Sequence, residues 1–120
     1  MAATAVCKLI TTVEGLGKVL EFAESWATTT TPTRACYNYH VQAVAATAEV
    51  LPLGDVTTVH LAVIKCIAGT VDIDTSYVTT FSAEVSIQVG EVAVLKPSGV
   101  LWLKANGATA STIEYILVGV

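Results

Sequence analysis

Polar and apolar residues alternate along the C-terminal half of the chain. Val85, Ile87 and Val89 alternate with polar residues, which is the period-two pattern of a half-buried β-strand, and Gly90 ends the run. Three further runs with strand-forming residues follow it, at 91–96, at 100–105 and from 113 nearly to the C-terminus. The pattern therefore predicts four strands between residue 85 and the end of the chain.

Turn residues separate these runs. Pro97-Ser98-Gly99 predicts a hairpin, because proline presets the turn and glycine accepts its unusual backbone angle. Asn106-Gly107 is a favoured dipeptide for the next reversal. The four strands are therefore expected to follow one another as a meander.

The N-terminal half contains two longer strand candidates, at 35–46 and 56–67, with a turn at Pro52–Asp55 between them and Gly69 after the second. In the second candidate both faces are apolar: Val59, Leu61 and Val63 share one face, and Ala62, Ile64 and Cys66 share the other. Such a strand is expected to be covered on both sides. One face of its sheet then meets the core, and the other meets something else.

Residues 16–26 fit two patterns. Leu16, Val19, Leu20 and Ala23 have helical spacing, but the threonines at 28–31 and a proline follow at once. Either a short helix or a strand is compatible with this segment.

The composition favours strands, because valine, alanine and threonine make up about two-fifths of the chain. We predict an all-β fold, a β-sandwich or jelly-roll-like barrel of about eight antiparallel strands. Residues 1–120 are expected to form one domain, with 1–14 as an extended arm.

Charge is scarce for a soluble domain. Hydrophobic residues make up 53% of the chain and charged residues 13%, about half the usual share, and the net charge is -4. A folded monomer of this mass exposes on the order of 6,000 Å², which so few charges cannot cover densely. The chain is therefore expected either to enter a membrane or to assemble, and its apolar runs are too short for a spanning helix.

Other classes are disfavoured by charge placement. The six basic residues are spread singly and the pI is near 4.9, so nucleic-acid binding is not expected. Lys8 and Glu14 flank only a few apolar residues, which does not resemble a signal peptide.

Cys7, Cys36 and Cys66 are odd in number and too widely spaced for a CxxC pair, so we expect three buried thiols and folding in a reducing compartment.

No residue pattern predicts a cofactor or an enzyme. Asp72–Ser76 starts like a calcium loop, but Tyr77 and Ala83 stand where glycine and glutamate are needed, so a solvated turn is expected. The two histidines are too few for a zinc site, no GxSxG is present, and Gly15–Lys18 lacks the phosphate-loop frame. Strand aromatics are usually core or interface anchors. The interface candidates are Tyr37, Tyr39, His40, His60 and Trp102.

The last forty residues carry a resemblance. FSAEVSIQVGE followed by GEVAVLKPSGVLWLKANGATASTIEYILVGV is similar to the C-terminal half of small β-sandwich virion proteins of tailed bacteriophages. The resemblance implies a capsid decoration or cement subunit, a homo-oligomer and commonly a trimer, that stabilises the major capsid protein of the virion after assembly in the host cytoplasm. Residues 1–14 and the loop at 28–33 are candidates for contacts with neighbours, because extended segments can add to a sheet edge.

Two alternatives belong to other classes. A tail, neck or fibre component, or a glycan-binding module of the virion, would use exposed aromatics such as Tyr37, Tyr39 or Trp102. A small hydrolase or ligand-binding barrel ranks last, because no constellation of polar residues stands out.

Overall fold

The computed structural model describes residues 3–42, 47–97, 99–107 and 110–120. Within these ranges the chain forms ten β-strands and no helix, which confirms the all-β prediction. No helix in these ranges is long and apolar enough to cross a membrane. The strands are β1 (Val6–Val13), β2 (Leu20–Ala27), β3 (Arg34–Gln42), β4 (Glu49–Val50), β5 (Val59–Ala68), β6 (Thr70–Asp74), β7 (Val85–Gln88), β8 (Val92–Leu95), β9 (Trp102–Ala105) and β10 (Ser111–Gly119).

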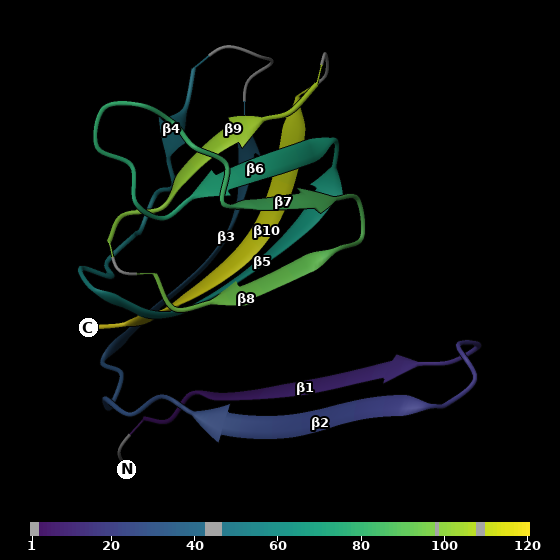
Figure 1. The fold of residues 1–120 in the computed structure, drawn as a ribbon. Coiled ribbons are helices and arrows are strands. Elements are labelled where there is room, and N and C mark those ends of the chain that lie inside the picture. The colour runs from purple at the N-terminus through teal and green to yellow at the C-terminus, as the bar shows by residue number, and fades with distance from the viewer. Residues whose placement is uncertain (1–2, 43–46, 98, 108–109) are drawn as a thin grey trace.

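Eight of these strands form two antiparallel sheets that make up the body of the molecule (Figure 1). The first sheet has the order β3-β10-β5-β8, and the second has the order β4-β9-β6-β7. β10 lies at the centre of the first sheet, because it pairs with β3 along one side and with β5 along the other. The two sheets pack as a β-sandwich, as predicted.

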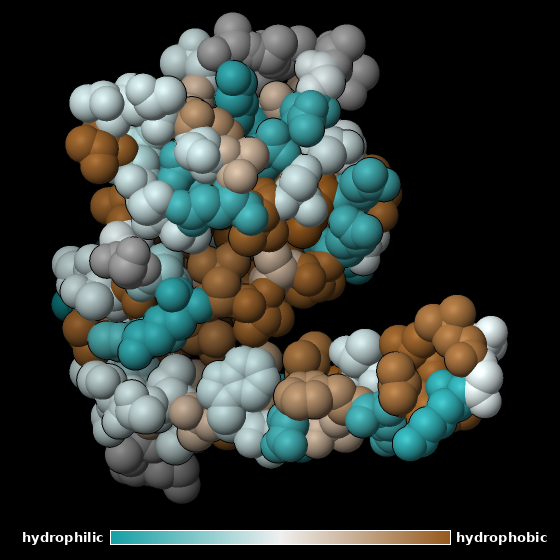
Figure 2. All heavy atoms as spheres, in the orientation of Figure 1, coloured by the Kyte–Doolittle hydropathy of each residue, from teal (hydrophilic) through white to brown (hydrophobic). Residues whose placement is uncertain are grey.

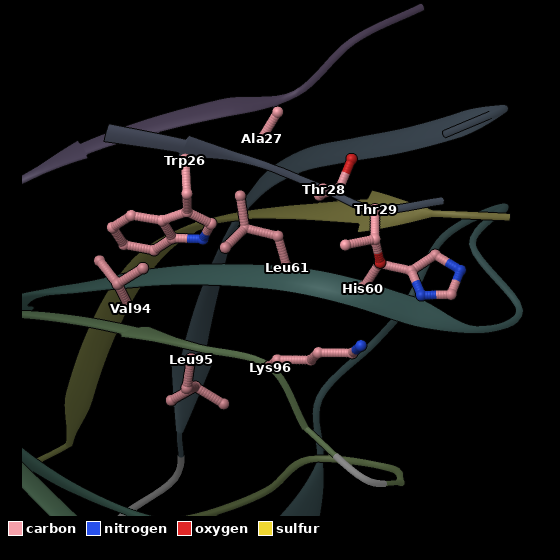
Figure 3. A pocket seen from close by; sticks show the side chains of 9 residues that line it. All are labelled: Trp26, Ala27, Thr28, Thr29, His60, Leu61, Val94, Leu95 and Lys96. Carbon is pink, nitrogen blue, oxygen red and sulfur yellow. The ribbon is translucent and has the colours of Figure 1, made fainter. Parts of the chain in front are cut away.

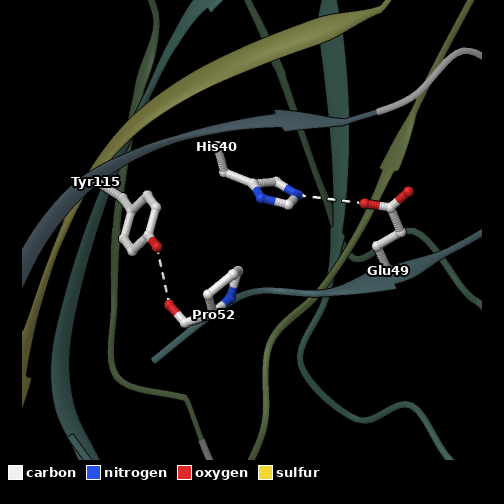
Figure 4. Close-up of polar contacts among 4 residues, drawn as sticks. All are labelled: His40, Glu49, Pro52 and Tyr115. Atoms are coloured by element: carbon white, nitrogen blue, oxygen red, sulfur yellow. Dashed lines mark hydrogen bonds and ion pairs between the residues drawn. The ribbon is translucent and has the colours of Figure 1, made fainter. Parts of the chain in front are cut away.

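The core lies between the sheets. Ile113, Tyr115 and Leu117 alternate inward along β10, and each is at most 1% exposed. The Tyr115 hydroxyl donates a hydrogen bond to the Pro52 carbonyl oxygen at 2.9 Å, so the polar end of this buried ring is satisfied (Figure 4). Every member of the buried core cluster lies between Leu51 and Leu117. The core of the body is therefore built without the first two strands.

The last four strands, β7 to β10, do not pair with one another in the order in which they follow along the chain. β8 pairs with β5 in the first sheet, whereas β9 pairs with β4 and β6 in the second. The predicted hairpin between 91–96 and 100–105 is therefore wrong, and so is the four-strand meander. Alternation identifies a strand and its buried face but not the strand with which it pairs. Two consecutive strands can lie in different sheets and still bury their apolar faces in the same core between the sheets. Ser98 of the predicted turn lies outside the described residues.

Gly69 marks one of these crossings. β5 ends immediately before it in the first sheet, and β6 begins immediately after it in the second. Its φ is +74°, and a Cβ at this position would approach the Ser111 Oγ to 2.7 Å and the Ala110 carbonyl oxygen to 2.8 Å. Both the backbone angle and the close approach require glycine here.

The two long strands of the N-terminal half are found with shifted ends. β3 covers most of the predicted strand at 35–46, of which 43–46 lie outside the described residues, and β5 covers most of the one at 56–67. The predicted turn at Pro52–Asp55 is present, since the Val56 N–H donates to the Leu53 carbonyl oxygen at 3.1 Å.

β1 and β2 form a separate two-stranded hairpin, called the arm below, which spans residues 6–27 and projects beside the body (Figure 1). Of the two alternatives for residues 16–26, the strand is found and the helix is wrong. Gly15 and Gly17 take positive φ in the connecting turn, which interrupts any helix at its start, and all eight residues of β2 pair with β1. The sequence placed the arm at 1–14, whereas the projecting hairpin also includes β2.

Candidate assembly surface

The strand register gives the arm two different faces. Residues paired in register point to the same side of a hairpin, and side chains alternate along each strand. Cys7 pairs with Trp26, Thr11 with Phe22, and Val13 with Leu20. One side, called the arm face, consists of Cys7, Leu9, Thr11, Val13, Leu20, Phe22, Glu24 and Trp26. The opposite side consists of Val6, Lys8, Ile10, Thr12, Glu21, Ala23, Ser25 and Ala27.

The arm face is apolar and open to solvent. Leu20 and Phe22 are each 54% exposed, and Trp26 is 42% exposed. Glu24 is the one charged residue on this face. An isolated two-stranded hairpin is marginally stable at best in water, and hairpins become stable when a hydrophobic face packs against another element. The arm face therefore has the properties of a surface that binds another protein surface.

A second apolar surface covers the solvent side of the first sheet. The outward positions of β10 are Thr112, Glu114, Ile116 and Val118, because Ile113, Tyr115 and Leu117 point inward. Their cross-strand partners on β3 and β5, and the partners of those residues on β8, share the same side. This surface, called the outer sheet face, consists of Ala35, Tyr37, Tyr39, Val41, Leu61, Val63, Lys65, Ala68, Val92, Val94, Thr112, Glu114, Ile116 and Val118.

β5 is apolar on both sides, and the outer sheet face includes its outward side. The inward residues of β5, including Ala62, Ile64 and Cys66, are fully buried in the core. The outward residues of β5 become more exposed away from the arm. Leu61 is 8% exposed, whereas Lys65 is exposed to solvent. The arm covers only one end of this face, and the remainder is open.

A polar group lies on the outer sheet face where the edge strand β3 meets β10. The hydroxyls of Tyr37 and Tyr39 lie 3.3 Å apart, and their rings meet edge to face with centroids 6.0 Å apart. Hydrogen bonding with Glu114 raises the pKa of Tyr39. The hydrogen bonds from Tyr39 and Tyr37, followed by the charge of Lys65, lower the pKa of Glu114. The carboxylate is therefore held in its charged form by its neighbours on the surface.

The arm meets the body at a small apolar cavity of about 240 Å³. Trp26 extends from β2 towards Leu61 on β5 and Val94 on β8, and these three side chains form its apolar part (Figure 3). His60 and Lys96 lie at its polar end, and the buried Nε2 of His60 has no hydrogen-bond partner among the described residues. Trp26 therefore fixes the inner end of the arm on the outer sheet face.

Beyond this contact the arm and the body separate. Figure 2 shows an open cleft between them, and apolar residues gather on the body above the cleft and along the arm. The extra surface is measurable, since the molecule exposes 7300 Å², whereas a compact monomer of 12.5 kDa exposes about 6,200 Å². The Cα radius of gyration is 15.5 Å, against about 13.6 Å for a compact domain of this length. The arm is therefore an extension with a large solvent-facing surface.

The five interface candidates from the sequence fall in four separate places. Tyr37 and Tyr39 lie together on the outer sheet face, where each is more than half exposed. His60 lines the cavity under Trp26. The other two candidates, His40 and Trp102, lie elsewhere.

His40 contacts a residue of the second sheet, and Trp102 belongs to that sheet and contacts the loop between β6 and β7. The Nε2 of His40 lies 3.5 Å from a carboxylate oxygen of Glu49 on β4, so this side chain links the two sheets at their edge (Figure 4). The ring of Trp102 on β9 stacks on Tyr77, with centroids 4.0 Å apart. The structure does not bring the two histidines together, because β10 lies between their strands.

The solvated turn predicted for Asp72–Ser76 is wrong for its first three residues, because Asp72–Asp74 are the end of β6 and the loop begins only at Thr75. Asp74 is 1% exposed and accepts hydrogen bonds of 2.8 Å from the backbone N–H groups of Ser76 and Ser82. Glu84 accepts hydrogen bonds from the hydroxyls of Thr75 and Ser76, which lower its pKa. The described residues contain no cluster of ligands that could hold a metal ion. The carboxylates therefore order this loop by binding its own N–H and O–H groups.

The three cysteines are free thiols. Cys66 is fully buried, as predicted, and burial raises the pKa of its thiol. Cys7 and Cys36 are only half-buried, so the prediction of three buried thiols is wrong for these two. Cys7 is on the arm, which has no core to bury it, and Cys36 lies at the edge of the sandwich on β3.

The sequence missed the arm face as a site. Leu20, Phe22 and Trp26 occupy alternate positions, which was the available signal. The helical spacing of Leu16, Val19, Leu20 and Ala23 in the same segment obscured it. No family model matches the chain, and no curated protein or solved structure is significantly similar to it. The fold and the two exposed apolar surfaces are therefore the observations from which a function is inferred.

Proposed function

We propose that the chain is a structural protein of a bacteriophage virion, a capsid decoration or cement subunit that self-associates and binds neighbouring coat proteins. The observation that carries this proposal is the arm, a hairpin whose apolar face is exposed along most of its length. The resemblance of residues 81–120 to virion proteins agrees with it.

Burial of apolar surface supplies the energy in this function. The molecule exposes about 1,100 Å² more than a compact monomer of its mass, by comparison of 7300 Å² with about 6,200 Å². Each square ångström of apolar surface removed from water contributes about 25 cal/mol before the entropy of association is subtracted. On a symmetric shell each modest contact is repeated many times, which multiplies the stabilisation of the particle.

Self-association and capsid binding use different parts of this surface. The arm turn at residues 14–19 projects past the body and carries Leu16, which is 79% exposed. A projecting apolar turn can reach a neighbouring subunit that the body itself does not touch. The extended loop at 28–33 lies at the base of the arm and is mostly exposed.

A glycan-binding module of a tail or fibre is the second candidate. Its supporting observation is the exposed pair Tyr37 and Tyr39, since aromatic rings are common contacts for sugars. The edge-to-face arrangement leaves the Tyr39 ring beside Glu114 rather than as an open platform. Quenching of tryptophan fluorescence by a panel of oligosaccharides would favour this candidate over the first.

The proposed function is tested on the particles themselves. Gradient-purified virions of the phage that encodes the chain should contain it in a fixed ratio to the major capsid protein, as measured by quantitative mass spectrometry. Particles that lack the chain should bind the purified protein to saturation and should then resist heat or low salt better. Absence of the chain from purified particles, together with no binding to them, would refute the proposal.

A further inference from the structure

We propose that the arm face of one copy packs on the outer sheet face of a second copy, so that each subunit gives one arm and receives one. This inference rests on the self-association in the proposed function and names the two surfaces that meet. The occupant of the open outer sheet face is thus the arm of another copy.

The two surfaces match in chemistry. Both present a row of aliphatic and aromatic side chains, with Phe22 at the middle of the arm face and Ile116 at the middle of the outer sheet face. Phe22 is 54% exposed and Ile116 is 40% exposed, although each lies in a strand that is paired with a neighbour. Packing these side chains together removes from water the apolar surface that the monomer leaves open.

Charge distinguishes this pairing from arm against arm. Glu24 is the one charged residue on the arm face. The outer sheet face carries Lys65 and Glu114, which are cross-strand partners, so its charges sum to zero. Packing arm against arm would bring two Glu24 side chains together, whereas packing the arm on the outer sheet face brings Glu24 to a surface without net charge.

A molecule cannot cover its own outer sheet face with its own arm in the observed arrangement. Trp26 fixes the inner end of the arm beside Leu61 and Val94, at the β8 side of the sheet. From there the hairpin extends past the body, so its turn lies beyond the sheet (Figure 1). Tyr37 and Tyr39 on the opposite edge strand stay exposed. The free part of the arm and the free part of the sheet are therefore available to different molecules.

The contact area agrees with a closed assembly. Strands of eight residues are about 27 Å long and a pair of them is about 10 Å wide, so the arm face covers roughly 270 Å² on each partner. A single contact would then bury roughly 540 Å² in total, which is below the size of a stable interface. A closed dimer with two such contacts buries roughly 1,080 Å², which passes the lower limit of about 1,000 Å² for a specific interface. A closed trimer has three such contacts and buries more.

The inference is tested with matched surface variants of the full chain. Phe22→Glu places a charge on the arm face, and Ile116→Glu places one on the outer sheet face. Val92→Glu gives a second change on the outer sheet face, at an edge strand where Val92 is 51% exposed. The control is Val78→Glu, because Val78 is 83% exposed in the loop between β6 and β7, outside both surfaces. Circular dichroism and thermal melting establish that each variant is folded.

The readout is native mass by light scattering behind a sizing column, from about 1 to about 300 µM. The wild type and Val78→Glu should run as a dimer or trimer. Phe22→Glu and at least one folded outer-face variant should weaken association by at least about tenfold. A wild-type chain that is monomeric at every concentration overturns the inference. Loss of association in Phe22→Glu alone, with both folded outer-face variants unaffected, also overturns it.

Mixing the variants separates this contact from arm-to-arm packing. Phe22→Glu keeps an intact outer sheet face and Ile116→Glu keeps an intact arm, so a mixed pair has one intact contact whereas a pair of either variant alone has none. An equimolar mixture should therefore associate more than either variant alone at the upper end of the concentration range. Val92→Glu replaces Ile116→Glu if the latter is unfolded. Failure of the mixture to associate, when each variant is folded and the wild type associates, contradicts the proposed pairing.

The two proposals fail in different ways. Rescue in the mixture, with no chain found in purified virions, would keep the inference and refute the proposed function. A chain present in virions but monomeric when isolated would keep the role in the virion and would refute both the self-association and the inference, since the arm would then bind another virion protein.

Discussion

Removal of the arm should leave a folded body. The buried core cluster lies entirely between Leu51 and Leu117, so a chain that begins at Pro32 behind an initiating methionine retains all of it. The hydrogen bond from the Thr33 N–H to the Gly119 carbonyl oxygen, at 2.9 Å, still holds the new N-terminus on the body. The truncated chain is therefore expected to fold cooperatively.

The expected cost can be worked out from the contact under Trp26. Without the arm, Leu61 and Val94 lose the cover of the indole ring. Complete burial of such a side chain contributes about 1.5–3 kcal/mol, so partial exposure of both costs about 2 kcal/mol. Domains usually have 5–15 kcal/mol of stability, and for a small domain about 2 kcal/mol lowers the Tm by roughly 8–16 °C.

Urea unfolding followed by tryptophan fluorescence measures this cost, because Trp102 remains in the truncated chain. Sizing of the same sample should show a monomer, since the arm face is gone. A truncated chain that is unfolded, or that loses more than about 5 kcal/mol, would show that the arm belongs to the folding core and would refute this reasoning.

Three other predictions concern the body. Gly69→Ala should destabilise the fold by about 1–3 kcal/mol in urea unfolding, because φ is +74° and the new methyl group meets Ser111; an unchanged midpoint would contradict it. Glu84 should titrate below 4.5 in NMR of its carboxyl group, because hydrogen bonds from Ser76 and Thr75 lower its pKa. The stability that Glu84 contributes is present above pH 4.5 and is lost as the pH falls through its folded pKa. A titration at the ordinary pKa of a glutamate would contradict these hydrogen bonds. The Cys66 thiol should resist a thiol reagent at pH 8 until the protein unfolds, since it is buried and its pKa is raised; labelling at the rate of a free thiol would contradict its burial.

Local pattern was enough to predict six of the eight strands of the body, whereas β4 and β6 were missed. The alternation at Val85, Ile87 and Val89 predicted β7. The two apolar faces of 56–67 predicted a strand with one face on the core and the other against a further surface. The pairing of strands was not predictable in the same way, because a turn such as the one before β9 fixes a reversal of direction but not the sheet in which the next strand lies. That choice depends on packing between distant residues.

The candidate site was only partly predictable. Tyr37 and Tyr39 were expected at an interface and are exposed on the outer sheet face, whereas His40 and Trp102 contact other residues of the body. The arm face escaped prediction because Leu20 fits both a helical and a strand spacing. Only the pairing of β2 with β1 assigns it to one face of a hairpin, and that pairing is a tertiary property.

The most direct test of the assembly account is the native mass of the full chain on dilution, measured beside Phe22→Glu. We expect the wild type to have two or three times the 12.5 kDa of one chain and to keep that mass as it is diluted. Phe22→Glu should have the mass of a single chain at the same concentrations. A wild-type protein of 12.5 kDa at every concentration would contradict the claim that the arm exists to join copies of this chain.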